Sequence, residues 1–112
     1  MKLMTEEIEK AFRKYPLYSQ DGKGLDAKIV VKFFGGSAAT WLITEGQKER
    51  DGDWTFFGYA TLDGEFWEWG YVMLSQLEEV RFPPFGLPVE RDICIKPGKS
   101  RVKDKASMFR GY

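Results

Sequence analysis

The fold is decided by residues 54–72, which read WTFFGYATLDGEFWEWGYV. Residues 54–60 and 66–72 are rich in aromatic and β-branched side chains, a composition typical of β-strands. Between them, Leu62-Asp63-Gly64 carries the Asp-Gly signal of a tight hairpin turn. Strands this close in sequence pair antiparallel, because a parallel pair needs a long crossover connection. The stretch therefore predicts an antiparallel hairpin.

Three further segments outside this hairpin are predicted as strands, at residues 27–34, 40–45 and 89–95. Gly35-Gly36-Ser37 separates the first two of them, and Pro97 ends the third. All three combine aromatic or β-branched residues with short, turn-like connections. They extend the predicted hairpin to a sheet of about five strands.

Two helices are predicted beside the sheet. Thr5 is a plausible N-cap for the first, and Pro16 ends it because the residue before a proline is pushed out of the helical region. The apolar residues of this segment recur at helical spacing: Ile8, Ala11, Phe12 and Tyr15. Ser75 with Glu78 three residues later matches a capping box and predicts a short helix to about residue 81. We therefore expect an α+β fold, an antiparallel sheet with both helices packed on one face.

The chain length of 112 residues fits one domain. The formal net charge is zero, but residues 96–112 contain six lysines and arginines and one aspartate. The remainder is correspondingly acidic. Because Pro97-Gly98 interrupts any regular structure, we expect a folded domain over residues 1–97 and a flexible basic tail over residues 98–112.

The composition excludes several chemistries. The chain has no histidine, which removes Ser-His-Asp and Cys-His catalysis and zinc sites built on histidine. Cys94 is the only cysteine, so no intrachain disulfide forms and a reducing, cytoplasmic location is expected. Between Ile93 and Ile95, its thiol is expected to be buried and inert. We predict no cofactor, no metal and no membrane partner, since no apolar run reaches the roughly 18 residues of a membrane span.

Several stretches resemble one family of small bacterial proteins. The resemblance rests on Leu17-Tyr18-Ser19-Gln20, Val31-Lys32-Phe33-Phe34, Glu68-Trp69-Gly70-Tyr71 and Leu87-Pro88-Val89-Glu90-Arg91-Asp92, and it extends over roughly residues 5 to 97. That family is catalogued only as a domain of unknown function, and its members are common on plasmids, conjugative elements and phages. The resemblance implies this genomic context and no established mechanism.

Two polar motifs are candidates for a site. In an extended segment, Glu90 and Asp92 project to one face and Arg91 to the other, and paired carboxylates serve as acid and base or hold a hard cation. The alternative for Arg91 is a structural ion pair or a contact with a backbone carbonyl. Lys23 lies in a loop with two glycines that could contact a phosphate, but this loop follows a helix and precedes a strand, so an ordinary turn is the default.

Aromatic residues and the basic tail are candidate binding surfaces. The predicted partner-binding aromatics are Trp41, Trp67, Trp69 and Tyr71. A sheet covered on one side leaves some of them exposed, and exposed apolar surface marks a partner site; the alternative is an aromatic-rich core. The predicted anion-binding residues of the tail are Lys99, Arg101, Lys103, Lys105 and Arg110.

These observations favour a non-catalytic protein–protein interaction module of a plasmid, conjugative element or phage, with counter-defence as one setting. One alternative is a nucleic-acid-binding accessory protein that uses the tail. Another is a histidine-independent enzyme that uses Glu90, Asp92 and Lys23. A protein partner is expected, because the acidic body disfavours phosphate binding.

Overall fold

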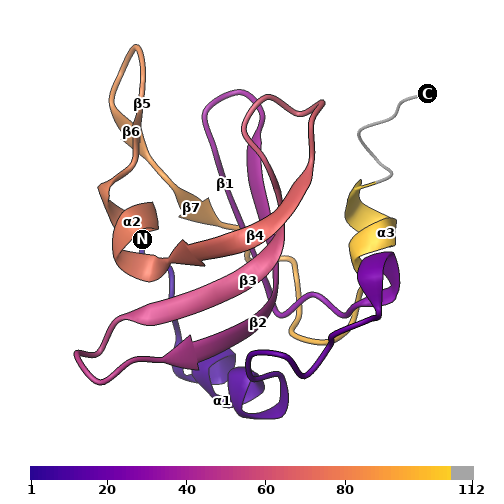
Figure 1. Ribbon diagram of the computed structural model, residues 1–112. Helices are drawn as coiled ribbons and strands as arrows, with labels where there is room; N and C mark the ends of the chain where they lie inside the picture. The colour runs from indigo at the N-terminus through magenta and orange to yellow at the C-terminus, as the bar shows by residue number, and fades with distance from the viewer. Residues whose placement is uncertain (107–112) are drawn as a thin grey trace.

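The computed structural model describes residues 1–106, and its centre is a five-stranded antiparallel sheet (Figure 1). The strand order is β4-β3-β2-β1-β7. The strands of this sheet are β1 (Val31–Gly35), β2 (Ala39–Lys48), β3 (Trp54–Thr61), β4 (Glu68–Met73) and β7 (Glu90–Arg91). Four helical segments accompany it, α1 (Glu6–Lys14), η1 (Gly24–Asp26), α2 (Leu74–Glu79) and α3 (Val102–Ala106). The predicted α+β class is confirmed.

The predicted hairpin is present as β3 and β4, with Gly58 opposite Gly70 and Tyr59 opposite Trp69. Its second strand begins at Glu68 rather than at Phe66. The delay has a local cause, since the Asp63 carboxylate accepts the backbone N–H groups of Glu65 and Phe66 at 2.8 and 3.0 Å. These bonds extend the turn by two residues.

The first hydrophobic core lies between the sheet and α1. The Thr5 hydroxyl accepts the N–H of Ile8 at 3.2 Å and so caps α1 as predicted. The Phe12 ring packs 5.4 Å from Trp54 and 5.5 Å from Phe56 between ring centroids. Other members of this core are Leu3, Phe33, Trp41, Ile43, Leu77 and Val89.

A second core covers the opposite face of the sheet, where α3 packs (Figure 1). It contains Ala27, Ile29 and Leu42 from the body, and Val102 and Ala106 from α3. The two predicted helices, α1 and α2, both contribute to the first core as expected, but α3 was not predicted and covers the face that was expected to stay open. The expected boundary after residue 97 also differs from the structure, because residues 98–106 help to bury this face; residues 107–112 lie outside the described residues.

The short helix α2 begins two residues earlier than predicted, and its cap is different. The backbone N–H of Met73 donates to the Gln76 side chain at 2.8 Å, so Met73 is the N-cap residue. The predicted cap, Ser75, instead donates its hydroxyl to the Asp53 carboxylate at 2.6 Å. The helix is thereby tied to the start of β3.

The segment after the proline-rich stretch is less regular than predicted. Only two of its residues, Glu90 and Arg91, form β7, and the Asp92 carboxylate then accepts the N–H of Cys94 at 2.9 Å in a turn. Cys94 is therefore exposed, which corrects the expectation of a buried thiol. Before it, β5 (Arg81–Phe82) pairs with β6 (Leu87–Pro88) as a separate two-stranded ribbon. No helix among residues 1–106 has the length and apolar character to cross a membrane.

Candidate functional site

Five aromatic rings form a continuous row on β3, on β4 and on the turn before β4. We call this row the aromatic strip; it consists of Tyr71, Phe57, Trp69, Tyr59 and Trp67. Successive ring centroids are 4.9, 5.7, 4.7 and 5.1 Å apart in that order. The strand register explains the row, because Phe57 lies opposite Tyr71 and Tyr59 opposite Trp69 on one face of the sheet.

One end of the aromatic strip is covered and the other is open. Tyr59 and Trp67 pack against the second core beneath α3. Beyond them, Trp69 is 37% exposed and Tyr71 is 58% exposed. The open end therefore presents large aromatic surfaces to the solvent beside the edge strand β4.

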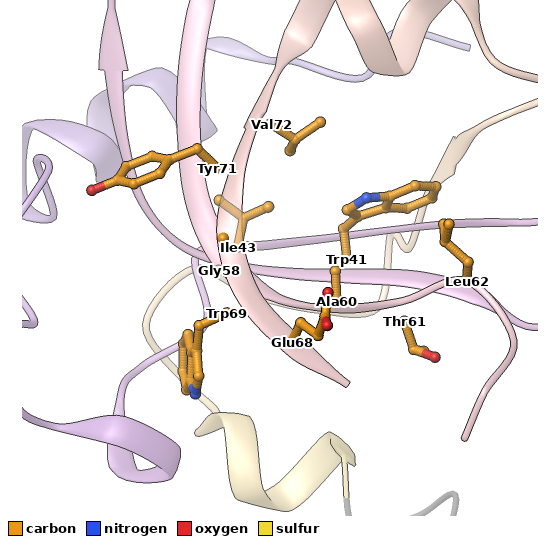
Figure 2. Close-up of a pocket in the computed structure, with 11 residues that line it drawn as sticks. Trp41, Ile43, Gly58, Ala60, Thr61, Leu62, Glu68, Trp69, Tyr71 and Val72 are labelled. Atoms are coloured by element: carbon orange, nitrogen blue, oxygen red, sulfur yellow. The ribbon is translucent and has the colours of Figure 1, made fainter. Parts of the chain in front are cut away.

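The structure brings three of the four predicted aromatics together and separates the fourth. Trp41 is only 8% exposed and belongs to the first core. In Figure 2, Trp41 and Val72 lie on one side of the β3–β4 ribbons, whereas Trp69 and Tyr71 lie on the other side. Trp41 is thus a core residue and no part of the aromatic strip.

A hollow of about 250 Å³ adjoins β4, and two glycines contribute to it (Figure 2). A Cβ atom at Gly58 would lie 2.8 Å from the Ile43 Cα, so the fold requires glycine there. A Cβ atom at Gly70 would meet no atom within 4 Å. Packing therefore does not require glycine at position 70, although glycine is unfavourable in the middle of a strand.

A cavity of about 330 Å³ lies next to the aromatic strip, and we call it the acidic pocket. Phe57 and Trp69 supply its aromatic wall, and Asp21 and Glu45 supply its carboxylates. The remaining lining residues are Gln20, Gly22, Gly24, Ala27 and Thr44. The pocket thus lies between β2, β3, β4 and the loop that precedes η1.

Glu45 is the most buried charged side chain of the acidic pocket, with 2% of its surface exposed. A β-bulge lies between Ile43 and Glu45, and Glu45 then pairs with Phe57. Its carboxylate oxygens accept the backbone N–H groups of Tyr18 at 2.7 Å and Gln20 at 2.9 Å. Glu45 therefore fixes the loop that forms one wall of the pocket.

Two residues of that loop are unusually constrained. Tyr18 has a φ of 74°, a left-handed conformation that non-glycine residues rarely adopt. The buried Gln20 side chain donates to the carbonyls of Lys28 and Thr44, each at 2.8 Å, and accepts the Lys28 N–H at 2.7 Å. These bonds hold the loop against β2 and fix the orientation of the Gln20 amide.

The pKa of the Tyr71 hydroxyl is raised above its ordinary value of 10.0. The largest cause is the partial exclusion of water by neighbouring atoms, followed by the nearby Tyr18 hydroxyl. The carboxylates of Glu45 and Asp21 add to the increase, because they disfavour a second negative charge. The open end of the aromatic strip therefore lies in a negative local field.

The predicted polar motif at residues 90–92 makes structural contacts. The Arg91 guanidinium donates to the Lys2 carbonyl at 2.6 Å, and the Asp92 carboxylate lies 3.5 Å from the Lys32 ammonium. Glu90 is exposed on β7, at the sheet edge opposite to β4. Lys23 belongs to the turns leading into η1, so it lies on a different element from this motif. No cluster of three or more potential metal-ligating side chains occurs within the described residues.

Two cations of the predicted anion-binding tail contact one aspartate of the body. The Lys103 ammonium lies 2.7 Å from the Asp26 carboxylate, and the Arg101 guanidinium donates to the Asp26 carbonyl at 2.8 Å. The hydrogen bond and charge of Lys103 lower the pKa of Asp26. Lys99 is exposed and Lys105 is half-buried, whereas Arg110 lies outside the described residues.

Comparison with known proteins identifies the family. Residues 3–105 match a family described as a protein of unknown function, DUF2958. The chain belongs to the DUF2958 family. The expected membership of a family catalogued only as a domain of unknown function is thereby confirmed, and the DUF2958 match includes the first hydrophobic core and all of the second except Ala106. No curated protein and no solved structure matches this DUF2958 chain.

The sequence did not point to Glu45, Tyr18 or Gln20 as site residues. The available signal was the position of Glu45, a carboxylate inside a strand whose neighbours Thr44 and Gly46 are also suited to burial. Recognition of its role requires the β-bulge and the distant loop, which no local pattern in the sequence supplies.

Proposed function

We propose that this DUF2958 protein is a non-catalytic protein-binding module whose partner contacts the open end of the aromatic strip. The observation that carries the proposal is the exposure of Trp69 and Tyr71 in a continuous row of neighbouring rings. Tyrosine and tryptophan are enriched in protein interfaces, where they bury much surface at a small cost in side-chain freedom.

The neighbouring edge of the sheet supports a protein partner. β4 is an edge strand, and its outer side has no partner strand among residues 1–106. Gly70 leaves open space above the middle of this strand. A glycine in a strand often marks the close approach of another backbone or ligand. A partner segment therefore has access both to the rings and to the edge of the sheet.

The two alternatives have less support. An enzyme based on Glu90, Asp92 and Lys23 would need these groups to act together, but they lie on different elements and Asp92 pairs with Lys32. Nucleic-acid binding would need a positive surface, whereas Asp26 accepts contacts from two of the tail cations and the aromatic strip adjoins two carboxylates. The setting on a mobile element, and a counter-defence role there, rest on the family resemblance alone.

The test begins by cross-linking in the native host to identify the partner, and continues with the purified pair. Trp69→Ala is expected to weaken binding by about 2 kcal/mol or more, because a central aromatic dominates such interfaces. Phe85→Ala is the matched control, since Phe85 is 82% exposed on the separate β5–β6 ribbon. Equal affinities for wild type, Trp69→Ala and Tyr71→Ala would contradict the proposal, as would tight, salt-resistant binding to DNA or RNA.

A further inference from the structure

We propose that the acidic pocket is a binding site for an organic cation, the side chain of a lysine or arginine on the partner protein. This inference rests on the proposed function and names the chemistry that the partner brings to the edge of the aromatic strip. The pocket has room for such a group, since its volume is about 330 Å³. Pockets that hold small organic groups start near this size.

The first argument is the charge of Glu45. Glu45 is 98% buried, and buried charges are normally paired with an opposite charge. The ion pairs found within residues 1–106 are Lys32–Asp92, Lys48–Glu9 and Lys103–Asp26, none of which includes Glu45. Two backbone N–H groups occupy only part of its capacity, because a carboxylate has about four acceptor positions. A donor that carries a positive charge would complete the site.

The second argument is the aromatic wall. The rings of Phe57 and Trp69 lie 5.7 Å apart with only 13° between their planes, and both line the pocket. An ammonium or guanidinium group is attracted to the face of such a ring, most strongly to tryptophan. Aromatic rings beside a carboxylate favour a cation over an anion.

The third argument is the backbone of the loop. Tyr18 keeps a left-handed conformation that is uncommon for a non-glycine residue, and the Glu45 carboxylate accepts its N–H. Strained conformations of this kind concentrate at ligand-binding sites. The Tyr18 carbonyl also accepts the backbone N–H of Asp21 at 3.2 Å, and Asp21 lines the pocket as a second carboxylate.

A metal ion is a less suitable occupant. Hard cations such as Ca²⁺ take six to eight oxygen ligands, and one wall of the pocket is the aromatic surface of Phe57 and Trp69. The described residues also contain no group of three or more acidic or sulfur ligands. An organic cation uses both the carboxylates and the rings.

The experiment is an NMR titration of the full chain with four small probes. n-Butylammonium represents lysine and n-propylguanidinium represents arginine, whereas n-butanol and butyrate are the neutral and negative controls. We expect saturable shifts of the Trp69 indole N–H and of the Gln20 backbone N–H with one or both cations. The cation that binds more tightly shows whether the partner supplies a lysine or an arginine side chain. Equal responses to n-butanol, or no saturable response to either cation, would overturn the proposal.

Variants locate the binding. Asp21→Asn removes an exposed rim charge and is expected to weaken cation binding about two- to fivefold, as for a solvent-screened charge pair. Trp69→Ala is expected to abolish the saturable response. Glu68→Gln is the matched control for Asp21→Asn. Glu68 is an exposed acid on β4, next to Trp69, and it does not line the acidic pocket. An equal loss for Glu68→Gln and Asp21→Asn would contradict the assigned site.

The outcome separates this inference from the proposed function. If Trp69→Ala weakens binding of the purified partner but neither cation binds, the proposed interaction surface is retained and the proposed cation site is wrong. If a cation saturates the pocket while Trp69→Ala leaves partner binding unchanged, the site stands and the partner binds elsewhere.

Discussion

The Glu45 carboxylate accepts the backbone N–H of Gln20 at 2.9 Å, although 25 residues separate them in the chain. The relationship is reinforced by the Gln20 side chain, which bonds to the backbone of Lys28 and Thr44. Together these bonds attach the loop before η1 to β2. The wall of the acidic pocket is therefore part of the folded framework rather than a separate flexible flap.

This attachment predicts a specific loss of stability for Gln20→Ala. The substitution leaves the Lys28 N–H and two carbonyls without their partner, and a buried group that loses its hydrogen bond costs about 1–3 kcal/mol. Urea denaturation measures the change in the free energy of unfolding. Ser19→Ala, an exposed neighbour, is the control and should differ little from wild type. A Gln20→Ala protein as stable as wild type would show that the bonds do not hold the loop.

A second prediction concerns α3. Val102 is 0% exposed in the second core, so Val102→Ala should lower the free energy of unfolding by about 1–3 kcal/mol through lost apolar contact and a small cavity. Thermal or urea unfolding gives the value. Lys99→Ala, on the exposed segment before α3, should unfold like wild type. If instead Val102→Ala has no effect, residues 98–106 do not contribute to the folded domain.

A third prediction compares two glycines that face each other across β3 and β4. Gly70→Val should fold with nearly wild-type stability, because a Cβ atom there meets open space. Gly58→Val should be strongly destabilised, since its Cβ atom would lie 2.8 Å from the Ile43 Cα. Far-UV circular dichroism and melting temperature separate the two. If the partner approaches β4, Gly70→Val also weakens partner binding, and unchanged affinity would place the partner away from this strand.

A fourth prediction is a pH dependence from Tyr71. Its pKa in the folded protein is raised above 10.0, so the folded state holds the proton more tightly than the unfolded state does. The associated stability is fully present below pH 10.0 and is lost as the pH rises through the raised pKa. Absorbance titration at alkaline pH should show one late-ionising tyrosine that disappears in Tyr71→Phe. An unchanged titration curve in that variant would contradict the assignment.

The sequence predicted the parts of the fold that depend on neighbouring residues. The hairpin at residues 54–72 combines strand composition with an Asp-Gly turn, and α1 has a capping Thr5 and a regular apolar stripe. The α3 segment has only two apolar core positions, Val102 and Ala106, among lysines, so charge concealed its burial. Tertiary contact, not local preference, determines its place.

The residues of the candidate site also fall into those that local sequence patterns indicate and those that depend on tertiary contacts. The spacing of Trp67, Trp69 and Tyr71 at alternate positions indicates a shared face, because alternate residues of a strand lie on the same side. Glu45 was missed because the bulge after Ile43 interrupts that alternation in β2. Its partners Tyr18 and Gln20 come from a loop more than 20 residues earlier, and such a contact leaves no periodic pattern.

The late position of α3 also has a consequence for synthesis. The segments that form β1 to β4 are translated before Val102, so Ile29 and Leu42 lack their cover on one side of the sheet until α3 has been made and has left the ribosome. Chains are made N-terminus first, and transiently exposed apolar surface favours aggregation. Newly made chains therefore expose this apolar surface until α3 docks, and we expect them to need chaperones over that interval.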